Sequence, residues 1–246
     1  MNTRNIEKYS DVYASGELDF ENILVKYRRK KVLEILEKYK PSNVLEIGCG
    51  YDSIVNYYKT FDSFTVVEPS EKFISEAIRN DNKNIKVYVD FLENKTDELK
   101  KNSYDFIILS SLLHEVPNVN NFMQHVADLC SKDTVLHINV PNSRAFHLLW
   151  AYESGLIKKL NELTPTALKL QQNTPFNSDL LTQAAEENGF HILEKGSYFI
   201  KPFNHSKMLQ LVNENIIDEK LLDGLYNMVK YMPDMGSEIF INCRLK

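Results

Sequence analysis

Residues 43–50 read NVLEIGCG, a short apolar run that ends in two glycines separated by one residue. The apolar run predicts a buried strand, and Gly48-Cys49-Gly50 predicts a tight turn at its carboxyl end. Glycines at such a point let backbone N–H groups approach a ligand where a helix begins. Because open α/β sheets bind ligands beyond the carboxyl ends of their strands, this stretch predicts both a strand and a binding edge.

Similar apolar runs follow at 64–67, 85–89, 104–110 and 134–140, with helical periodicity between most of them, notably at 71–79 and 122–129. Strands that alternate with helices indicate a parallel sheet covered on both faces. Apolar residues at helical spacing also predict a helix before Pro41. A helix at 178–188 precedes two late strands, 191–200 and 237–245, which we expect to form an antiparallel edge pair.

The composition of the chain excludes several classes of protein. The chain has 246 residues with 29 Lys+Arg against 34 Asp+Glu, so one large domain of slightly acidic charge is expected. An acidic balance argues against nucleic-acid binding, and no run approaches the ~20 apolar residues of a membrane helix. Cys49, Cys130 and Cys243 are isolated, which excludes a Cys-rich zinc site and suits a reducing cytoplasm. We therefore expect a cytoplasmic protein without a metal.

A second acidic residue indicates the kind of ligand. Glu68 ends the second predicted strand, eighteen positions after Gly50, where a carboxylate can accept both hydroxyls of a ribose. A dinucleotide fingerprint needs a third glycine three residues after the second, but Ser53 stands there. Glu46, just before the loop, would repel a pyrophosphate and suits an amino group. These residues favour a nucleoside cofactor over a dinucleotide.

The series VLEIGCG, VVEPS, VDFLEN and YDFIILSSLLHEVPN resembles the motifs of class I S-adenosylmethionine-dependent methyltransferases over residues 43–140. The resemblance implies a seven-stranded, mostly parallel Rossmann-like α/β sheet with helices on both faces and a reversed late hairpin. It further implies one methyltransferase domain, 1–246, whose parts are an N-terminal helical lid (1–40), a cofactor-binding core (41–141) and two helical acceptor-cap insertions (142–176 and 201–236).

The resemblance also implies a site for the methionine part of S-adenosylmethionine, which leaves as S-adenosylhomocysteine. Gly48, Cys49 and Gly50 would border the methionine moiety, with Glu46 oriented toward its amino group. Ser110, at the end of the fourth strand, would lie below the methionine chain.

The nucleoside part would be bound by the ends of the second and third strands. Glu68 would hold the ribose hydroxyls, with Pro69 and Ser70 beside them. Asp90 would accept from the adenine amino group, and Phe91 would line the adenine slot.

The N-terminal region offers further cofactor contacts. Arg28 or Arg29 could pair with the cofactor carboxylate, although charge runs on helices are usually solvated. Tyr9 and Tyr13 resemble the aromatic N-terminal lid of small-molecule members, and they could equally pack on the next helix.

An oxygen acceptor must lose a proton near the transition state, which suits a base with a pKa near 7. His114 follows the fourth strand in LLHEVPN, where small-molecule members of the family often have a histidine, and we expect it to be that base. It could instead only shape the pocket, with Glu115 as a helix-end charge. His147, Lys201 and His205 lie in the two insertions, and we expect them to contact the acceptor.

These features predict methyl transfer to a small polar metabolite. We expect O-methylation of a sugar or of a phosphorylated intermediate of a surface-glycan pathway. The alternatives are N-methylation of an amino sugar, a non-catalytic S-adenosylmethionine-binding protein, and a nicotinamide dehydrogenase, which Ser53 disfavours.

Overall fold

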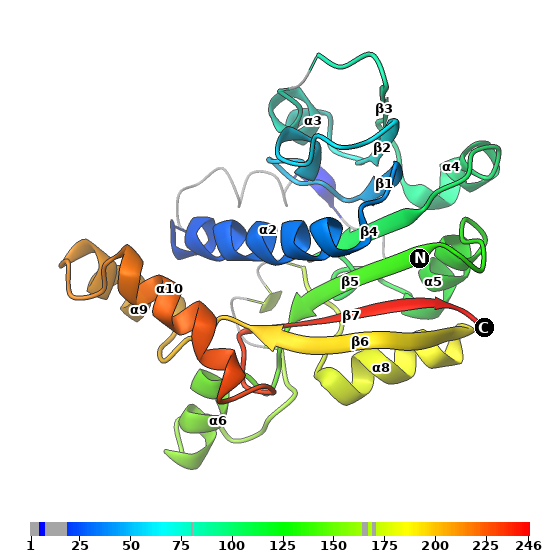
Figure 1. The fold of residues 1–246 in the computed structure, drawn as a ribbon. Helices are drawn as coiled ribbons and strands as arrows, with labels where there is room; N and C mark the ends of the chain where they lie inside the picture. Colours follow the sequence, from blue (N-terminus) through cyan, green and yellow to red (C-terminus); the bar gives the residue numbers. More distant parts are fainter. Residues whose placement is uncertain (1–4, 8–18, 80, 164–166, 169–170) are drawn as a thin grey trace.

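The computed structural model describes residues 5–7, 19–79, 81–163, 167–168 and 171–246. Seven strands form one sheet in the order β3-β2-β1-β4-β5-β7-β6 (Figure 1). Their bounds are β1 (Asn43–Ile47), β2 (Ser63–Val67), β3 (Ile85–Tyr88), β4 (Phe106–Ser110), β5 (Val135–Pro141), β6 (Phe190–Tyr198) and β7 (Glu238–Leu245).

The first five strands pair in parallel, and β7 pairs antiparallel with both β5 and β6. The predicted seven-stranded, mostly parallel sheet with a reversed late pair is therefore confirmed. β1 lies between β2 and β4, so the chain leaves it toward one edge and later returns on its other side. The loops after β1 and β4 diverge at this reversal of strand order, which is where α/β sheets form a crevice.

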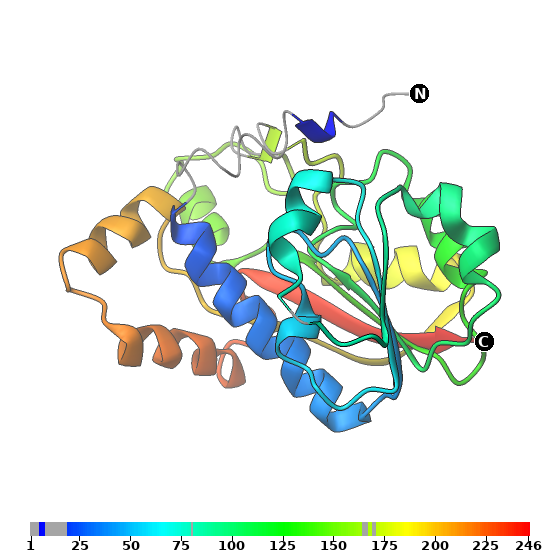
Figure 2. The same ribbon diagram turned by 90° about the horizontal axis from the view of Figure 1, so that it is seen from above.

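Helices cover both faces of the sheet (Figures 1 and 2). One apolar core joins the sheet to α4 (Leu92–Leu99), α5 (Val119–Ala127) and α8 (Ser178–Glu187), and the other joins it to α2 (Asp19–Tyr39), α9 (His205–Asn213) and α10 (Glu219–Asn227). Adjacent residues of β1 belong to different cores: Val44 packs in the core that contains α2, whereas Leu45 packs in the core that contains α4. Side chains of a strand alternate between faces, so a strand buried on both sides must be apolar throughout.

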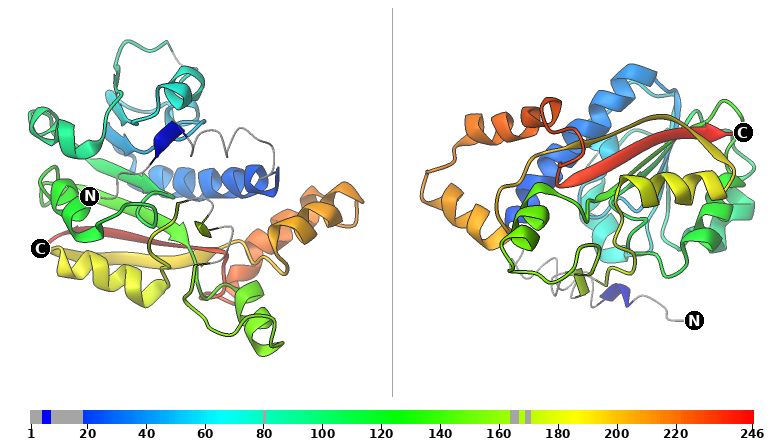
Figure 3. Two further views of the ribbon diagram at one scale, coloured as in Figure 1. Left: turned by 180° about the vertical axis from the view of Figure 1, so that it is seen from behind. Right: turned by 90° about the horizontal axis from the view of Figure 1, so that it is seen from below.

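The remaining elements are η1 (Ile54–Asn56), α3 (Glu71–Ala77), α6 (Phe146–Glu153) and η2 (Met228–Lys230). Viewed from behind and from below, α9 and α10 extend to one side of the sheet next to α2, while α8 covers the opposite face (Figure 3). No helix in the described part of the chain is long and apolar enough to cross a membrane.

A buried ion pair fixes α2 against the C-terminal strand. The Arg28 guanidinium donates from Nε to both carboxylate oxygens of Glu238, at 3.1 and 3.0 Å, and from Nη2 to Glu21 at 2.9 Å. The Tyr198 hydroxyl donates a further hydrogen bond to Glu238, which is 2% exposed. These contacts join α2, β6 and β7 across more than two hundred residues of sequence.

Glu238→Ala should therefore lower the free energy of unfolding by about 3 kcal/mol, because it leaves a buried guanidinium without its main partner. Glu219→Ala is the matched control, since it removes only the exposed ion pair with Lys26 and should cost less than about 1 kcal/mol. Urea unfolding of both variants measures the difference. Equal small losses would show that the Arg28 contacts do not anchor α2.

Candidate active site

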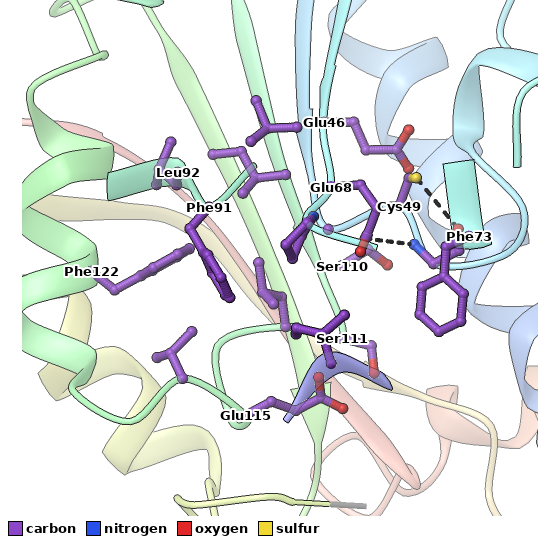
Figure 4. Close-up of a pocket in the computed structure, with 18 of the residues that line it drawn as sticks. Glu46, Cys49, Glu68, Phe73, Phe91, Leu92, Ser110, Ser111, Glu115 and Phe122 are labelled. Atoms are coloured by element: carbon purple, nitrogen blue, oxygen red, sulfur yellow. Dashed lines mark hydrogen bonds between the residues drawn. The ribbon is translucent and has the colours of Figure 1, made fainter. Parts of the chain in front are cut away.

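A cavity of about 1140 Å³ opens at the carboxyl ends of β1, β2 and β4 (Figure 4). Most of the residues predicted to bind the cofactor line it: Arg28, Glu46, Gly48, Cys49, Gly50, Glu68, Pro69, Asp90, Phe91 and Ser110. Among the described residues, no group of three or more His, Cys, Asp or Glu side chains could hold a metal ion. The predicted cofactor residues from four strand ends thus meet in one space.

The loop after β1 needs its glycines. Gly48 and Gly50 have φ of +76° and +57°, in the left-handed region that side chains with a Cβ rarely adopt. A Cβ on Gly48 would also lie 3.0 Å from Cδ2 of Leu112, in the loop after β4. The Gly48 amide donates to the Val67 carbonyl at 2.8 Å, so the loop is held against the end of β2. The backbone of this loop therefore forms a close wall of the cavity.

Glu68 is held at the end of β2 by two backbone amides. Its carboxylate accepts from Gly50 N at 3.3 Å and from Ser70 N at 3.0 Å, and the residue is 5% exposed. Ser70 is absent from the cavity lining; it is the N-cap of α3, and its hydroxyl accepts a hydrogen bond from Phe73 N. Glu68 thus links the glycine loop to α3 while it faces the cavity.

Glu46 is a buried carboxylate with a perturbed pKa. It accepts from the Ser53 hydroxyl and from the Ile54 amide at 3.2 Å, and it is 2% exposed. Burial raises its pKa to about 7, against the opposing effect of these hydrogen bonds. A cation bound in the cavity would favour the ionised form of this carboxylate.

The cavity wall after β3 combines an acid and an aromatic ring. The hydrogen bond from Asn94 lowers the pKa of Asp90, whose Oδ1 also accepts from Phe91 N at 2.8 Å. Phe91 is 41% exposed, and its ring lies in the cavity near Leu92 and Phe122 (Figure 4). A partly exposed ring in a cavity offers a flat apolar surface on which a base can stack.

Both arginines of α2 line the cavity, and both have protein partners. Arg28 is held by Glu21 and Glu238, as described above. Arg29 pairs with Asp52 and lies over the Tyr57 ring at 4.1 Å. Pairing of either arginine with a cofactor carboxylate stays a prediction. Tyr9 and Tyr13 lie outside the described residues.

The loop after β4 places Glu115, not His114, in the cavity wall. Both residues are 2% exposed, but only Glu115 lines the cavity, and its carboxylate points into it (Figure 4). His114 Nε2 lies 3.7 Å from Glu115 Oε1. From the sequence, Glu115 was interpreted as a helix-end charge. Its position next to His114, in a loop that follows a strand, was the one feature that could have indicated a place in the site. The role of His114 as a base stays a prediction.

The first insertion fixes this loop from outside. The backbone amides of Asn173 and Thr174 donate to the His114 carbonyl at 2.8 and 3.1 Å, and Asn173 Nδ2 donates to the Glu115 carbonyl at 2.7 Å. The His114–Glu115 pair therefore has a defined backbone position.

His147, Lys201 and His205 do not line the cavity. His147 lies on α6, Lys201 follows β6 and His205 begins α9. The His205 ring lies 5.7 Å from that of Phe20, because α9 packs beside α2 instead of over the cavity. Contact of these residues with an acceptor, and the cap expected from the two insertions, stay predictions.

The raised pKa of Glu46 should make the stability of the protein depend on pH. Its pKa is about 7 in the folded protein against 4.5 for an ordinary glutamate, so the folded state binds more protons between these values. Its contribution to stability is therefore present below about pH 4.5 and is lost as pH rises through 7.

Glu46→Gln should remove this dependence. We expect the stability of wild type minus that of Glu46→Gln to fall by up to about 3 kcal/mol between pH 4.5 and 7.5. The comparison cancels His137, whose pKa burial lowers to about 4 and which acts with the opposite sign. Urea unfolding across this range provides the measurement, and a constant difference would contradict the raised pKa.

Sequence comparisons give one family match and a partial match to a much longer relative. A family profile described as a methyltransferase domain matches residues 22–195, more than half of the chain. A stretch of 113 residues is 26% identical to the polyketide synthase component of lovastatin nonaketide synthase from Aspergillus terreus. This stretch covers 42% of the chain but 4% of that relative, so the chain spans a small part of the relative's length.

Solved structures share the fold along nearly the whole chain. They include a Thermotoga maritima methyltransferase described as a possible histamine N-methyltransferase (TM-score 0.59, 16% identity, covering 94% of this chain and 96% of that one). Another is the 1,6-didemethyltoxoflavin-N1-methyltransferase of Burkholderia thailandensis (TM-score 0.58, 9% identity, covering 98% of this chain and 88% of that one). A third is the N-methyltransferase NodS of Bradyrhizobium japonicum in complex with S-adenosylhomocysteine (TM-score 0.55, 11% identity, covering 93% of this chain and 89% of that one).

At such identities these structures show the fold, and the family profile shows the class. The expectations of a methyltransferase, of its Rossmann-like sheet and of S-adenosylmethionine as cofactor are confirmed. The chain belongs to the methyltransferase domain family and has the fold of class I S-adenosylmethionine-dependent methyltransferases.

Proposed function

We propose that this enzyme methylates an oxygen of a small polar metabolite, a sugar or a phosphorylated intermediate of a surface-glycan pathway. One observation supports the proposal above the others: the strand-end residues Glu46, Glu68, Asp90 and Ser110 line a single cavity. The cavity is slightly larger than the usual range for small-molecule sites, so it has room for an acceptor beside a cofactor.

The residues present fit S-adenosylmethionine. The left-handed Gly48 and Gly50 give a close backbone wall, Glu68 is fixed for two ribose hydroxyls, and the exposed ring of Phe91 suits adenine. When bound, the cofactor supplies a methyl group on a positively charged sulfur. The acidic lining of the cavity favours that charge.

Glu68→Gln should weaken S-adenosylhomocysteine binding by about 1.5–3 kcal/mol, the range for losing charged hydrogen bonds. Glu71→Gln, on the exposed first turn of α3, is the matched control and should bind normally. Calorimetry measures both affinities, with thermal unfolding as the check that each variant folds. Full affinity in a folded Glu68→Gln protein would contradict the proposed cofactor site.

The geometry also suggests a path for the acceptor proton. Glu115 lies in the cavity wall, and His114 lies directly behind it with 3.7 Å between Nε2 and Oε1. We propose that Glu115 accepts the hydrogen bond of the acceptor hydroxyl and takes its proton as the oxygen bonds to the methyl carbon, and that Glu115 then passes this proton to His114. A positioned base of this kind contributes about 10²–10⁴ to a rate.

Glu115→Gln and His114→Gln should each lower the rate with a hydroxyl acceptor by about 10²–10⁴ and leave S-adenosylhomocysteine affinity nearly intact. Glu98→Gln, an exposed carboxylate on α4, should keep the full rate. Labelled S-adenosylmethionine and fractionated metabolites provide the assay, with mass identification of the product. Normal turnover in both loop variants would remove the proposed proton path.

N-methylation of an amine is the second candidate. The similar solved structures include N-methyltransferases, and a buried carboxylate in the cavity wall can accept a hydrogen bond from an amino group. An amine needs only to arrive unprotonated. The rate would then follow the pKa of the acceptor amine and would persist in His114→Gln.

A further inference from the structure

A second group of buried polar side chains lies beside the cavity. Lys201 is only 5% exposed, and its ammonium makes no hydrogen bond or ion pair with the described residues. His147 Nδ1 is also buried, and it has no hydrogen-bond partner. His205 comes close to both, from the first turn of α9. Three basic side chains from three segments therefore interact electrostatically, and the Trp150–Phe203 ring contact at 5.4 Å holds α6 against the segment that carries Lys201.

The charges of this group are set by burial. Burial, followed by the charges of Lys201 and His205, lowers the pKa of His147 well below its usual value. Burial and the Lys201 charge lower the pKa of His205 to about 3, so both imidazoles are neutral at pH 7. Burial lowers the pKa of Lys201 to about 8, and the ammonium keeps its proton at neutral pH.

Nearby carboxylates do not satisfy the ammonium. Glu21 from α2 and Glu238 from β7 act on the charge of Lys201, which in turn acts on His147 of α6 and His205 of α9. Arg28 of α2 and Glu238 also act on His205. Arg28 and the Tyr198 hydroxyl bind the two glutamates at hydrogen-bond distance. The glutamates raise the pKa of Lys201, but neither lies within ion-pair distance of it.

Desolvation of an ammonium that has no acceptor costs free energy, and an anionic oxygen from a ligand would offset that cost. An imidazole N–H beside an ammonium is a further donor for the same oxygen. We propose that Lys201, His147 and His205 form a subsite for an anionic group, a carboxylate or a phosphate, carried by the methyl acceptor.

The inference of this subsite rests on the proposed function, because the subsite would bind part of the methyl acceptor. Glu21 connects the subsite to the cavity. Glu21 lines the cavity, and its charge acts on Lys201. His147 and His205 each keep part of their surface exposed to solvent, although His147 Nδ1 is buried. An acceptor held here by its acidic group would have its reactive end directed toward the cavity.

Trp150 provides a direct readout of anion binding. It is the single tryptophan, and its ring lies 5.4 Å from that of Phe203, two residues after Lys201. We would titrate the protein, saturated with S-adenosylhomocysteine, with sulfate, phosphate and acetate at constant ionic strength. We expect a saturable change in fluorescence with millimolar Kd. Tighter phosphate binding indicates a phosphorylated acceptor, and tighter acetate binding indicates a carboxylic acid.

Two lysine variants test the assignment. Lys201→Met should weaken anion binding by about tenfold or more, as expected for loss of a charged hydrogen bond. Lys207→Met is the control, because Lys207 is exposed and its ammonium lies 6.0 Å from the same Phe203 ring. It should bind anions normally. A signal that survives Lys201→Met, or one lost equally in Lys207→Met, overturns the proposal.

The pH dependence gives an independent check. Sulfate keeps its charge from about pH 6 to 9, so its affinity reports the protein alone. Affinity should be constant below the Lys201 pKa of about 8 and fall as pH rises through it, because the bound form needs the proton. Lys201→Met should also unfold at the same or a higher temperature. Constant affinity across this range, or a clear loss of stability in Lys201→Met, contradicts the subsite.

Calorimetry with S-adenosylhomocysteine separates this inference from the proposed function. Binding of the cofactor product without any anion signal overturns only the subsite. Absence of cofactor-product binding overturns the proposed function, whereas the anion titration of the protein alone still decides whether Lys201 binds anions.

Discussion

The Arg28 guanidinium is the contact on which the arrangement of the site depends. Its planar group binds two carboxylates, Glu21 on its own helix and Glu238 on the last strand. A buried guanidinium cannot lose its proton, so it must keep such partners, and the pairing fixes the rotation of α2. One face of α2 then lines the cavity, while its other contacts place α9 and the segment after β6.

The carboxylates of the cavity show how one kind of side chain takes different charges. Glu46 is desolvated, and its pKa rises to about 7. Asp90 is more exposed and receives a hydrogen bond from Asn94, which lowers its pKa. Glu68 is fixed by two amides between these positions. Their environments therefore divide the cavity into a part whose charge can change near neutral pH and a part that stays anionic.

The sequence was most informative where local rules decide the structure. Strand positions, the turn at Gly48 and the strand-end place of Glu68 follow from apolar runs and glycines, and the structure has them there. α4 was missed, because only Leu92, Thr96 and Leu99 of its residues are buried among charges. Such a short, mostly charged segment lacks the apolar periodicity that identifies a helix.

Features that depend on tertiary packing could not be read from the sequence. In the loop after β4, the sequence has no periodicity that would indicate which of two adjacent side chains faces the cavity. His114 was therefore favoured over Glu115 as the residue next to the acceptor. The place of the second insertion depends on packing of Met208 and Tyr226 against α2, which is distant in sequence. The grouping of Lys201 with His147 likewise arises from segments that meet only in the folded chain.

The position of β7 has a consequence for how the chain is made. β6 reaches the rest of the sheet only through β7, which follows it after some forty residues. During synthesis, the edge of β5 away from β4 and the edge of β6 that will pair with β7 therefore keep unpaired N–H and C=O groups until β7 emerges from the ribosome. Exposed strand edges of this kind can pair with other chains, so the nascent protein depends on rapid insertion of β7 between β5 and β6.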